Sequence, residues 1–294
     1  MSRVRGQRLT LVPFTLVVAL VAALVLTFAS GGTPVAHAVG GGPVILMGVD
    51  GDDIFHAPAG NYKSLVDIML TNVSNAGSDI LVIGGGKSGT DDVTTFWNGI
   101  ASQSSMTPTY VNGAAAITNQ SFAGFALIAV VSDVTNTPGG GLTNAENTAL
   151  SGRSADIATH VNAEGGLMGF SSCSTTDPYG YLGGVGAVTC TSASYTDIVA
   201  TTAGTAAGVS DALEGDAWHD VYETFPSFLV VLATAPTVSG KAAVIGGSSV
   251  TIVPEVADTA TPVPGVGTTG LVALAVAMVV AGSIYYRRRA AKQF

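Results

Sequence analysis

The sequence predicts an α/β fold: a three-layer sandwich with a mostly parallel sheet, plus a C-terminal transmembrane helix. Short, continuous apolar runs alternate with helix-like stretches, which is typical of parallel strands covered on both faces by helices. The segment between the two hydrophobic ends, residues 39–253, is long enough for one domain with a full core. A seventeen-residue apolar run directly before an arginine cluster predicts the transmembrane helix.

The N-terminal residues 1–38 are predicted to be an export signal. Arg3, Arg5 and Arg8 form a basic start, residues 16–28 are an apolar core, and residues 35–38 fit a small-x-small cleavage site. A retained membrane anchor is the alternative, because the apolar run is near spanning length.

The C-terminal residues are predicted to anchor the protein in the cell membrane. Residues 254–269 form a stalk rich in Pro, Thr and Gly, residues 270–286 the transmembrane helix, and residues 287–294 a basic tail. The arginines at 287–289 favour a cytoplasmic C-terminus, because positive charge stays inside. We therefore expect the α/β domain, residues 39–253, to lie outside.

The charge distribution argues against nucleic acid as a partner. Of 11 basic residues, seven lie in the two ends; four remain in the exported part against all 20 acidic residues, a formal net charge of −16. Such a surface repels nucleic acid and tolerates divalent cations. An acidic structural protein of the cell surface or matrix, associating through calcium, is one alternative that this charge keeps open.

Apolar periodicity and capping signals place the elements along the chain. Thr143 and Glu146 form a capping box at the start of a long helix, which Gly165 and Gly166 end. The expected strands are 44–49, 80–83, 125–131, 166–170, 228–233 and 242–252, and the other expected helices are 62–73 and 92–102.

The loops that follow the strands are the expected ligand site, because ligands of open parallel sheets bind beyond the carboxyl ends of the strands. The candidate ligand-binding residues there are Asp50, Asp52, Asp53, Gly85, Gly86, Lys87, Asp133, Ser171 and Ser172. Asp50, Asp52 and Asp53 are also candidates for holding Ca²⁺, although a solvated acidic turn fits the same pattern.

The glycine loop is compatible with phosphate binding, since it follows a strand and precedes a helix N-terminus. It is not a Walker loop, because Leu81 stands where that motif needs Gly before Gly86, Lys87 and Ser88. A tight strand-to-helix turn is the favoured interpretation.

Ser171 stands where a nucleophile elbow would present a serine. Gly169, Phe170 and Ser171 match the first three positions of G-x-S-x-G, but Cys173 replaces the second Gly. His219 and Asp220 are the candidate base and orienting acid of a serine hydrolase built on Ser171.

Cys173 and Cys190 are predicted to form a disulfide. Both lie in the exported part, where an isolated pair of cysteines usually bonds. A bond there would close a glycine-rich loop.

Several segments resemble the class I glutamine amidotransferase-like superfamily, and within it the trehalose-utilisation (ThuA-like) domains and their secreted relatives. Those domains end the corresponding strand in a G-G-x-x-G-x-H or G-x-C pattern, and Ser171 occupies the matching position after Gly165. Residues 218–233 and 240–247 are similar to the later strands and the glycine turn of the family. The resemblance covers about residues 44–252 and implies a flavodoxin-like sandwich.

The chain departs from the family at the positions that carry catalysis. Amidotransferases need Cys at the elbow and a downstream His-x-Glu; here the elbow residue is Ser171, and residues 246–249 contain no His. The C-terminal segment resembles bacterial sorting signals, which implies a sorting or processing enzyme as a partner. We therefore expect a non-catalytic, surface-anchored domain that binds a small ligand or glycan, with the serine hydrolase and the acidic structural protein as alternatives.

Overall fold

The computed structural model describes residues 40–54, 59–183 and 187–253. The predicted export signal, stalk, transmembrane helix and basic tail lie outside the described residues and stay predictions. Within those three stretches, no helix is both long and apolar enough to cross a membrane.

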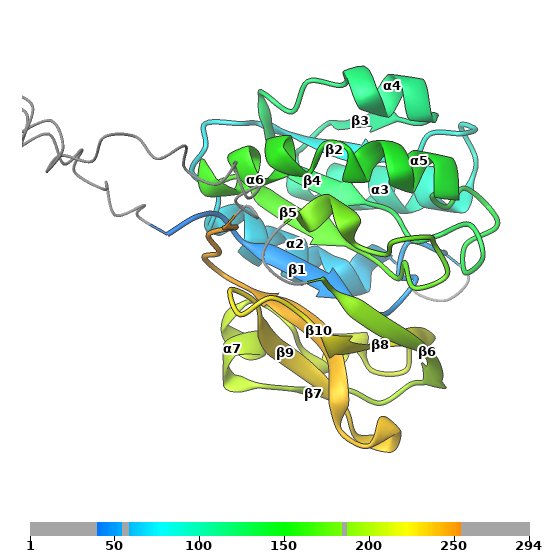
Figure 1. Ribbon diagram of the computed structural model, residues 1–294, viewed down its shortest axis with the longest axis vertical. Helices are drawn as coiled ribbons and strands as arrows, with labels where there is room; N and C mark the ends of the chain where they lie inside the picture. The colour runs from blue at the N-terminus through cyan, green and yellow to red at the C-terminus, as the bar shows by residue number, and fades with distance from the viewer. Residues whose placement is uncertain (1–39, 55–58, 184–186, 254–294) are drawn as a thin grey trace, which may run out of the picture.

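The centre of the described fold is a block of five parallel strands (Figure 1). They are β1 (Val44–Met47), β2 (Asp79–Ile83), β3 (Pro108–Val111), β4 (Phe125–Val130) and β5 (Gly166–Gly169). Their order across the sheet is β3-β2-β4-β5-β1, and each neighbouring pair is parallel.

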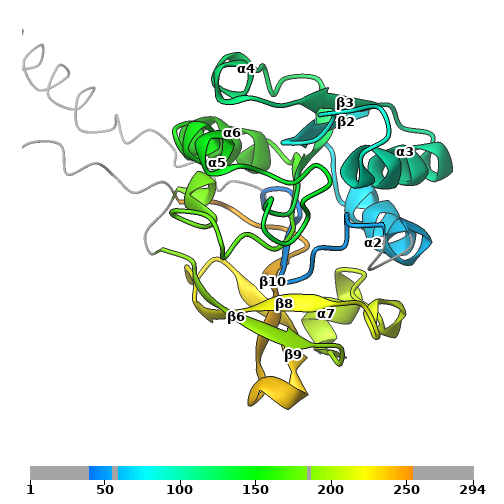
Figure 2. The same cartoon turned by 90° about the vertical axis from the view of Figure 1, so that its right-hand side faces the viewer.

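Helices cover both faces of this block (Figure 2). The chain runs from β1 towards β3 in one direction and returns through β4 to β5 in the other. Because crossovers between parallel strands are right-handed, the outward and return helices lie on opposite faces. The outward helices are α2 (Ala59–Thr71) and α3 (Asp92–Ser104); the return helices are α4 (Ala114–Asn119), α5 (Asn144–Ser151) and α6 (Ser154–Asn162).

The expected α/β fold with a parallel central sheet between helices is confirmed at the level of layers. The strand order is not the 2-1-3-4-5 order of flavodoxin, because β1 lies beside β5 and not beside β2.

The second half of the chain extends the sheet with antiparallel strands. β10 pairs with β1, β8 with β10 and β6 with β8, while β9 pairs with both β10 and β7. The elements are β6 (Thr189–Tyr195), β7 (Val199–Ala200), α7 (Thr202–Ala206), β8 (Trp218–Thr224), β9 (Val230–Ala235) and β10 (Lys241–Gly247). The parallel arrangement is therefore limited to the centre. The link from β9 to β10 is too short for a parallel crossover, and these two strands pair antiparallel.

The helix expected from Thr143 onward is two helices. The capping box is present, with Thr143 accepting from the Glu146 N–H and the Glu146 carboxylate accepting from the Thr143 N–H. The helix breaks at Gly152 and Arg153, where Arg153 has non-helical φ and ψ of −107° and 15°. The break turns the Arg153 side chain towards the carbonyls of α4, a contact that the apolar pattern does not reveal.

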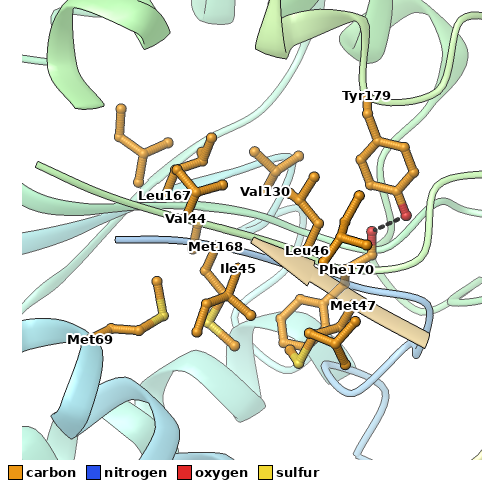
Figure 3. Packing of buried hydrophobic residues seen from close by; sticks show 14 of the residues in the cluster. Val44, Ile45, Leu46, Met47, Met69, Val130, Leu167, Met168, Phe170 and Tyr179 are labelled. Carbon is orange, nitrogen blue, oxygen red and sulfur yellow. Dashed lines mark hydrogen bonds between the residues drawn. The ribbon is translucent and has the colours of Figure 1, made fainter. Parts of the chain in front are cut away.

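The core lies on both faces of β1 and β5. All four residues of β1 are fully buried, and their side chains alternate between the two helical layers, as Figure 3 shows for Ile45 and Leu46. Just beyond β5, Phe170 contacts the rings of Tyr62 and Phe96 edge-on, and its carbonyl accepts a hydrogen bond from the Tyr179 hydroxyl. This packing fixes the backbone at the point where β5 delivers Ser171.

Candidate ligand site at the carboxyl edge

Most of the predicted site residues converge at one edge of the sheet. β1, β4 and β5 are adjacent and parallel, so the loops that begin after Met47, Val130 and Gly169 start side by side. β8 then crosses the end of β1, where the N–H groups of His219 and Asp220 both donate to the Gly48 carbonyl, at 2.8 and 2.9 Å. Four segments distant in sequence thus supply one polar network.

Gly48 allows this crossing. A Cβ atom at this position would lie 2.0 Å from the carbonyl oxygen of Asp220 and 2.8 Å from its carbonyl carbon. Only a residue without a side chain lets the two backbones approach so closely.

Ser171 is fully buried, and its hydroxyl is bonded on both sides. The hydroxyl donates to Asp220 Oδ2 at 2.5 Å and accepts from Asn136 Nδ2 at 2.7 Å. The backbone of Ser171 does not adopt positive φ, and the residues that follow it form turns. The strained strand-to-helix elbow of serine nucleophiles is therefore absent at Ser171, as Cys173 at its fifth position predicts.

Replacing Ser171 with Ala should lower the free energy of unfolding by about 1–3 kcal/mol, because the buried Asp220 carboxylate and the Asn136 amide each lose a partner. Chemical denaturation measures this loss. Ser102→Ala, at an exposed serine of α3, is the control and should change stability by no more than about 0.5 kcal/mol. Equal behaviour of the two variants would show that the Ser171 hydrogen bonds contribute nothing.

Asp220 places a buried carboxylate in this network, which opposes folding unless it is well paired. Its side chain is fully buried, Oδ2 also accepts from the Cys173 N–H at 3.2 Å, and no hydrogen bond to Oδ1 is found within the described residues. Burial raises the pKa of Asp220, and the charge of Asp133 adds to the rise, while the Ser171 and Cys173 donors lower it. The net effect of these surroundings is a pKa of Asp220 above its ordinary value.

His219 pairs with Asp50 and not with Ser171. Its Nε2 lies 3.1 Å from Asp50 Oδ1, and its side chain keeps 29% of its surface exposed while that of Asp50 is buried. The hydrogen bond to Asp50 raises the pKa of His219, and the charges of Asp220 and Asp133 raise it further against the effect of burial. The carboxylates of Asp50, Asp133 and Asp220 thus all favour a proton on the His219 ring.

Asp52 is held by the loop that follows β4. Its Oδ1 accepts from Ser132 Oγ at 2.5 Å and its Oδ2 from the Ser132 N–H at 3.1 Å; Ser132 Oγ also contacts Thr137 Oγ1. Burial raises the pKa of Asp52 to about 7, with the neighbouring Asp50 charge adding to the rise and the Ser132 donors opposing it.

Asp133 stabilises its own turn. Its carboxylate accepts from the N–H groups of Thr135 and Asn136, at 2.8 and 3.0 Å, and its own N–H donates to the Ser171 carbonyl at 2.9 Å. These bonds hold Asn136 against Ser171. Asp133 is thus a positioning residue for Asn136.

The three aspartates after β1 do not gather around one point. Asp50 faces His219, Asp52 faces Ser132, and Asp53 lies near Asp92, whose pKa it helps to raise. In the part of the chain that the structure describes, no three His, Cys, Asp or Glu side chains form a group that could hold a metal ion. The geometry of these aspartates therefore gives no support to the Ca²⁺ site considered from the sequence.

The glycine loop after β2 is a packed turn whose lysine is already engaged. Gly86 has a φ of 76°, and a Cβ there would lie 2.4 Å from Tyr110, while Gly85 is enclosed by Val93 and Val82. Lys87 Nζ donates to Glu146 Oε2 at 2.9 Å and to the Gly141 carbonyl. Gly85, Gly86 and Lys87 hold three loops together, which favours the structural interpretation of this turn over phosphate binding.

The cysteines are paired as predicted, with Cα atoms of Cys173 and Cys190 5.8 Å apart. The bond joins the loop after Ser171 to strand β6, and Ser172 lies beside it with its hydroxyl 3.1 Å from Thr175 Oγ1. Both cysteines are bonded, so neither is a free thiol nucleophile.

Replacing both cysteines with Ala should lower the free energy of unfolding by about 3 kcal/mol, because the unfolded chain regains the freedom of a loop with a sequence separation of 17. Thermal denaturation of the double variant measures the effect. In native protein, mass spectrometry after alkylation without reductant should find no modified thiol. Alkylation of Cys173 under those conditions would contradict the pairing.

Asn136 and Thr137 are site residues that the sequence did not single out. Both lie in the turn after β4, and Asn136 reaches Ser171 from the third position after Asp133. An Asp followed closely by Asn and Pro138 is a turn signal, but it does not reveal which strand the turn faces.

The fold and the site together define an α/β domain. At the carboxyl edge of its parallel strands, this domain holds a buried network of hydrogen-bonded acidic residues. Comparisons with protein-family models, with curated proteins and with solved structures found no match to this chain. The resemblance to the amidotransferase-like superfamily therefore remains a prediction from sequence.

Proposed function

We propose that residues 39–253 are an exported domain, anchored through residues 270–286, that binds a small ligand or glycan at the carboxyl edge of its sheet without catalysing a reaction. The observation that carries this proposal is the environment of Ser171. Its hydroxyl is committed to Asp220 and Asn136, and the imidazole of His219 is paired with Asp50. Hydrolysis by Ser171 would need the imidazole itself within hydrogen-bond reach of the hydroxyl.

The groups that face solvent around this network favour a binding role. His219 is partly exposed, and Ile54 and Val134 expose 36% and 41% of their surfaces. Ile54 lies two positions after Asp52, and Val134 lies two positions after Ser132. Asp52 and Ser132 are hydrogen-bonded to each other. A ligand at this edge could contact the partly exposed imidazole of His219 and these aliphatic side chains.

The unfavourable free energy of burying the carboxylates of this network also supports a role beyond stability. Asp50, Asp52 and Asp220 are all fully buried, and burial of a carboxylate opposes folding unless it is well paired. Groups with strongly perturbed pKa values concentrate at functional sites. The family resemblance is consistent with this scaffold, and the Ser at position 171 fits the loss of amidotransferase chemistry.

A ligand screen tests the binding role. Full-length protein is screened by thermal shift against neutral sugars, amino acids and small amines, and each hit is repeated with His219→Gln. We expect a hit whose stabilisation is lost in His219→Gln and retained in Asp197→Asn, an exposed carboxylate outside the hydrogen-bonded network. A screen without a hit, or hits indifferent to His219, would count against the proposal.

A hydrolase assay tests the alternative. Wild-type protein and Ser171→Ala are compared on ester, amide and glycoside panels, with Ser102→Ala as the matched control. Turnover that Ser171→Ala abolishes and Ser102→Ala retains would replace the binding role with a serine hydrolase.

Membrane anchoring is tested separately by fractionating cells that express the full chain or a chain ending at Val253. We expect the full chain in the membrane fraction and the shortened chain in the soluble or secreted fraction. Equal distribution of the two would refute the anchor.

A further inference from the structure

A pocket lies among the segments that precede β4 and β5, away from the carboxyl edge of the sheet. These segments are at the left-hand end of the strands in Figure 1. The pocket has a volume of about 420 Å³, within the range of small-molecule sites. Its walls come from Arg153, which directly precedes α6, from Asp156 and His160 of α6, and from the turn that contains Ser121 and Phe122.

Arg153 presents a fixed guanidinium edge to this pocket. Its Nη1 donates to the carbonyls of Ile117 and Thr118 at 2.9 and 2.8 Å, its Nε donates to Asp156 at 2.5 Å, and the group lies 4.5 Å from the centre of the Phe122 ring. No bond to Nη2 is found within the described residues, so its two N–H groups remain as donors.

Asp156 supplies the complementary acceptor. Its Oδ2 accepts from Arg153 Nε, its side chain is 56% exposed, and Oδ1 has no partner among the described residues. Ser121 adds a hydroxyl that accepts from the Ala123 N–H and can still donate.

The charges of the pocket balance. Arg153 and Asp156 form an ion pair, so their charges offset each other. The Nε2 of His160 lies 3.2 Å from the Gly166 carbonyl, and burial lowers the pKa of His160, which disfavours a charge on its ring. An anionic ligand would meet Asp156, and a cationic ligand would meet Arg153. A hydroxyl group both donates and accepts a hydrogen bond. Adjacent hydroxyls of a ligand therefore match the Nη2 donors of Arg153 beside the Oδ1 acceptor of Asp156.

We propose that this pocket binds an uncharged, hydroxyl-rich small molecule, a polyol or a sugar, through Arg153 and Asp156. The site is separate from the carboxyl edge and does not depend on the function proposed there.

Saturation-transfer NMR on the full-length protein tests the proposal, with methyl β-D-glucopyranoside as the neutral probe and glucuronate and glucosamine as charged probes of the same ring size. We expect the neutral probe to bind and the charged probes to bind more weakly. Asp156→Asn should weaken the neutral probe about tenfold, the effect of losing a hydrogen bond to a charged group. Asp67→Asn, which removes the acid of another intrahelical ion pair, is the matched control and should bind as wild type does.

Ala163→Phe provides a second variant that removes no polar contact. Ala163 lines the pocket at the end of α6, and a ring there should fill the space and abolish binding while the melting temperature stays near that of wild type. Absence of binding by the neutral probe, equal or tighter binding of a charged probe, or binding unchanged in both Asp156→Asn and Ala163→Phe would overturn the proposal.

Discussion

Gly48→Ala is expected to destabilise the protein by about 4 kcal/mol, although it adds a single methyl group. The new Cβ would lie 2.0 Å from the Asp220 carbonyl oxygen, so β8 must move away from the end of β1. That movement breaks the two hydrogen bonds that the Gly48 carbonyl accepts from His219 and Asp220. Overpacking against backbone costs up to about 3 kcal/mol and each lost hydrogen bond about 1 kcal/mol.

Thermal denaturation should show a decrease of about 8–16 °C for Gly48→Ala, given the size of the domain. Gly60→Ala is the matched control: Gly60 lies in α2, and a Cβ there meets nothing within 4 Å. Replacing a helical glycine in open space should stabilise the protein by up to about 1 kcal/mol. A Gly48→Ala protein as stable as Gly60→Ala would mean that β8 does not cross β1 as described.

Four of the five central strands were predictable because they carry the signal by themselves, whereas the partly exposed edge strand β3 was not expected. The continuous apolar runs at 44–47, 80–83 and 125–130 are buried on both faces, so burial follows directly from composition. In the antiparallel half this signal is present only in part: the apolar runs at 228–233 and 242–252 predicted strands where β9 and β10 lie, whereas β6 carries no such run. β6 contains Thr, Ser and Ala at largely exposed or half-buried positions, and only pairing with β8 makes it a strand.

The location of the candidate site was predictable, but the hydrogen-bond partners of its side chains were not. The rule that ligands bind beyond the carboxyl ends of parallel strands selects Asp50, Asp52, Asp133 and Ser171, and these residues do converge. Their partners depend on how β8 crosses β1, which is a tertiary contact between residues about 170 positions apart. The expectation that His219 would serve Ser171 failed to anticipate Asp50 as the imidazole's partner.

Asp52→Asn is expected to make the protein more stable at neutral and alkaline pH and to leave its stability unchanged in acid. The pKa of Asp52 is raised from 3.8 to about 7 by burial. Below pH 3.8 both the folded and the unfolded states hold the proton, so the stabilisation is fully present there. As the pH rises towards about 7, the unfolded chain releases the proton and the folded protein keeps it, so stability falls with pH across this window. Between the two pKa values, each increase of one pH unit lowers the free energy of unfolding by about 1.4 kcal/mol. The total loss of stability is therefore at most about 4 kcal/mol.

Asparagine preserves the contacts of Asp52 without its charge. Its carbonyl oxygen can accept from the Ser132 N–H, its amide can donate to Ser132 Oγ, and that hydroxyl can in turn donate to Thr137 Oγ1. Urea denaturation from pH 4 to pH 8 should therefore give a wild-type stability curve that falls relative to that of Asp52→Asn, with a gap of about 2–4 kcal/mol at pH 8. His219, whose pKa is also raised, contributes the same slope to both proteins and cancels in the difference. Asp197→Asn, at an exposed carboxylate, should follow the wild-type curve. If the curve of Asp52→Asn also runs parallel to that of wild type, folding does not raise the pKa of Asp52, and the charge of its carboxylate is as well accommodated in the folded protein as in the unfolded chain.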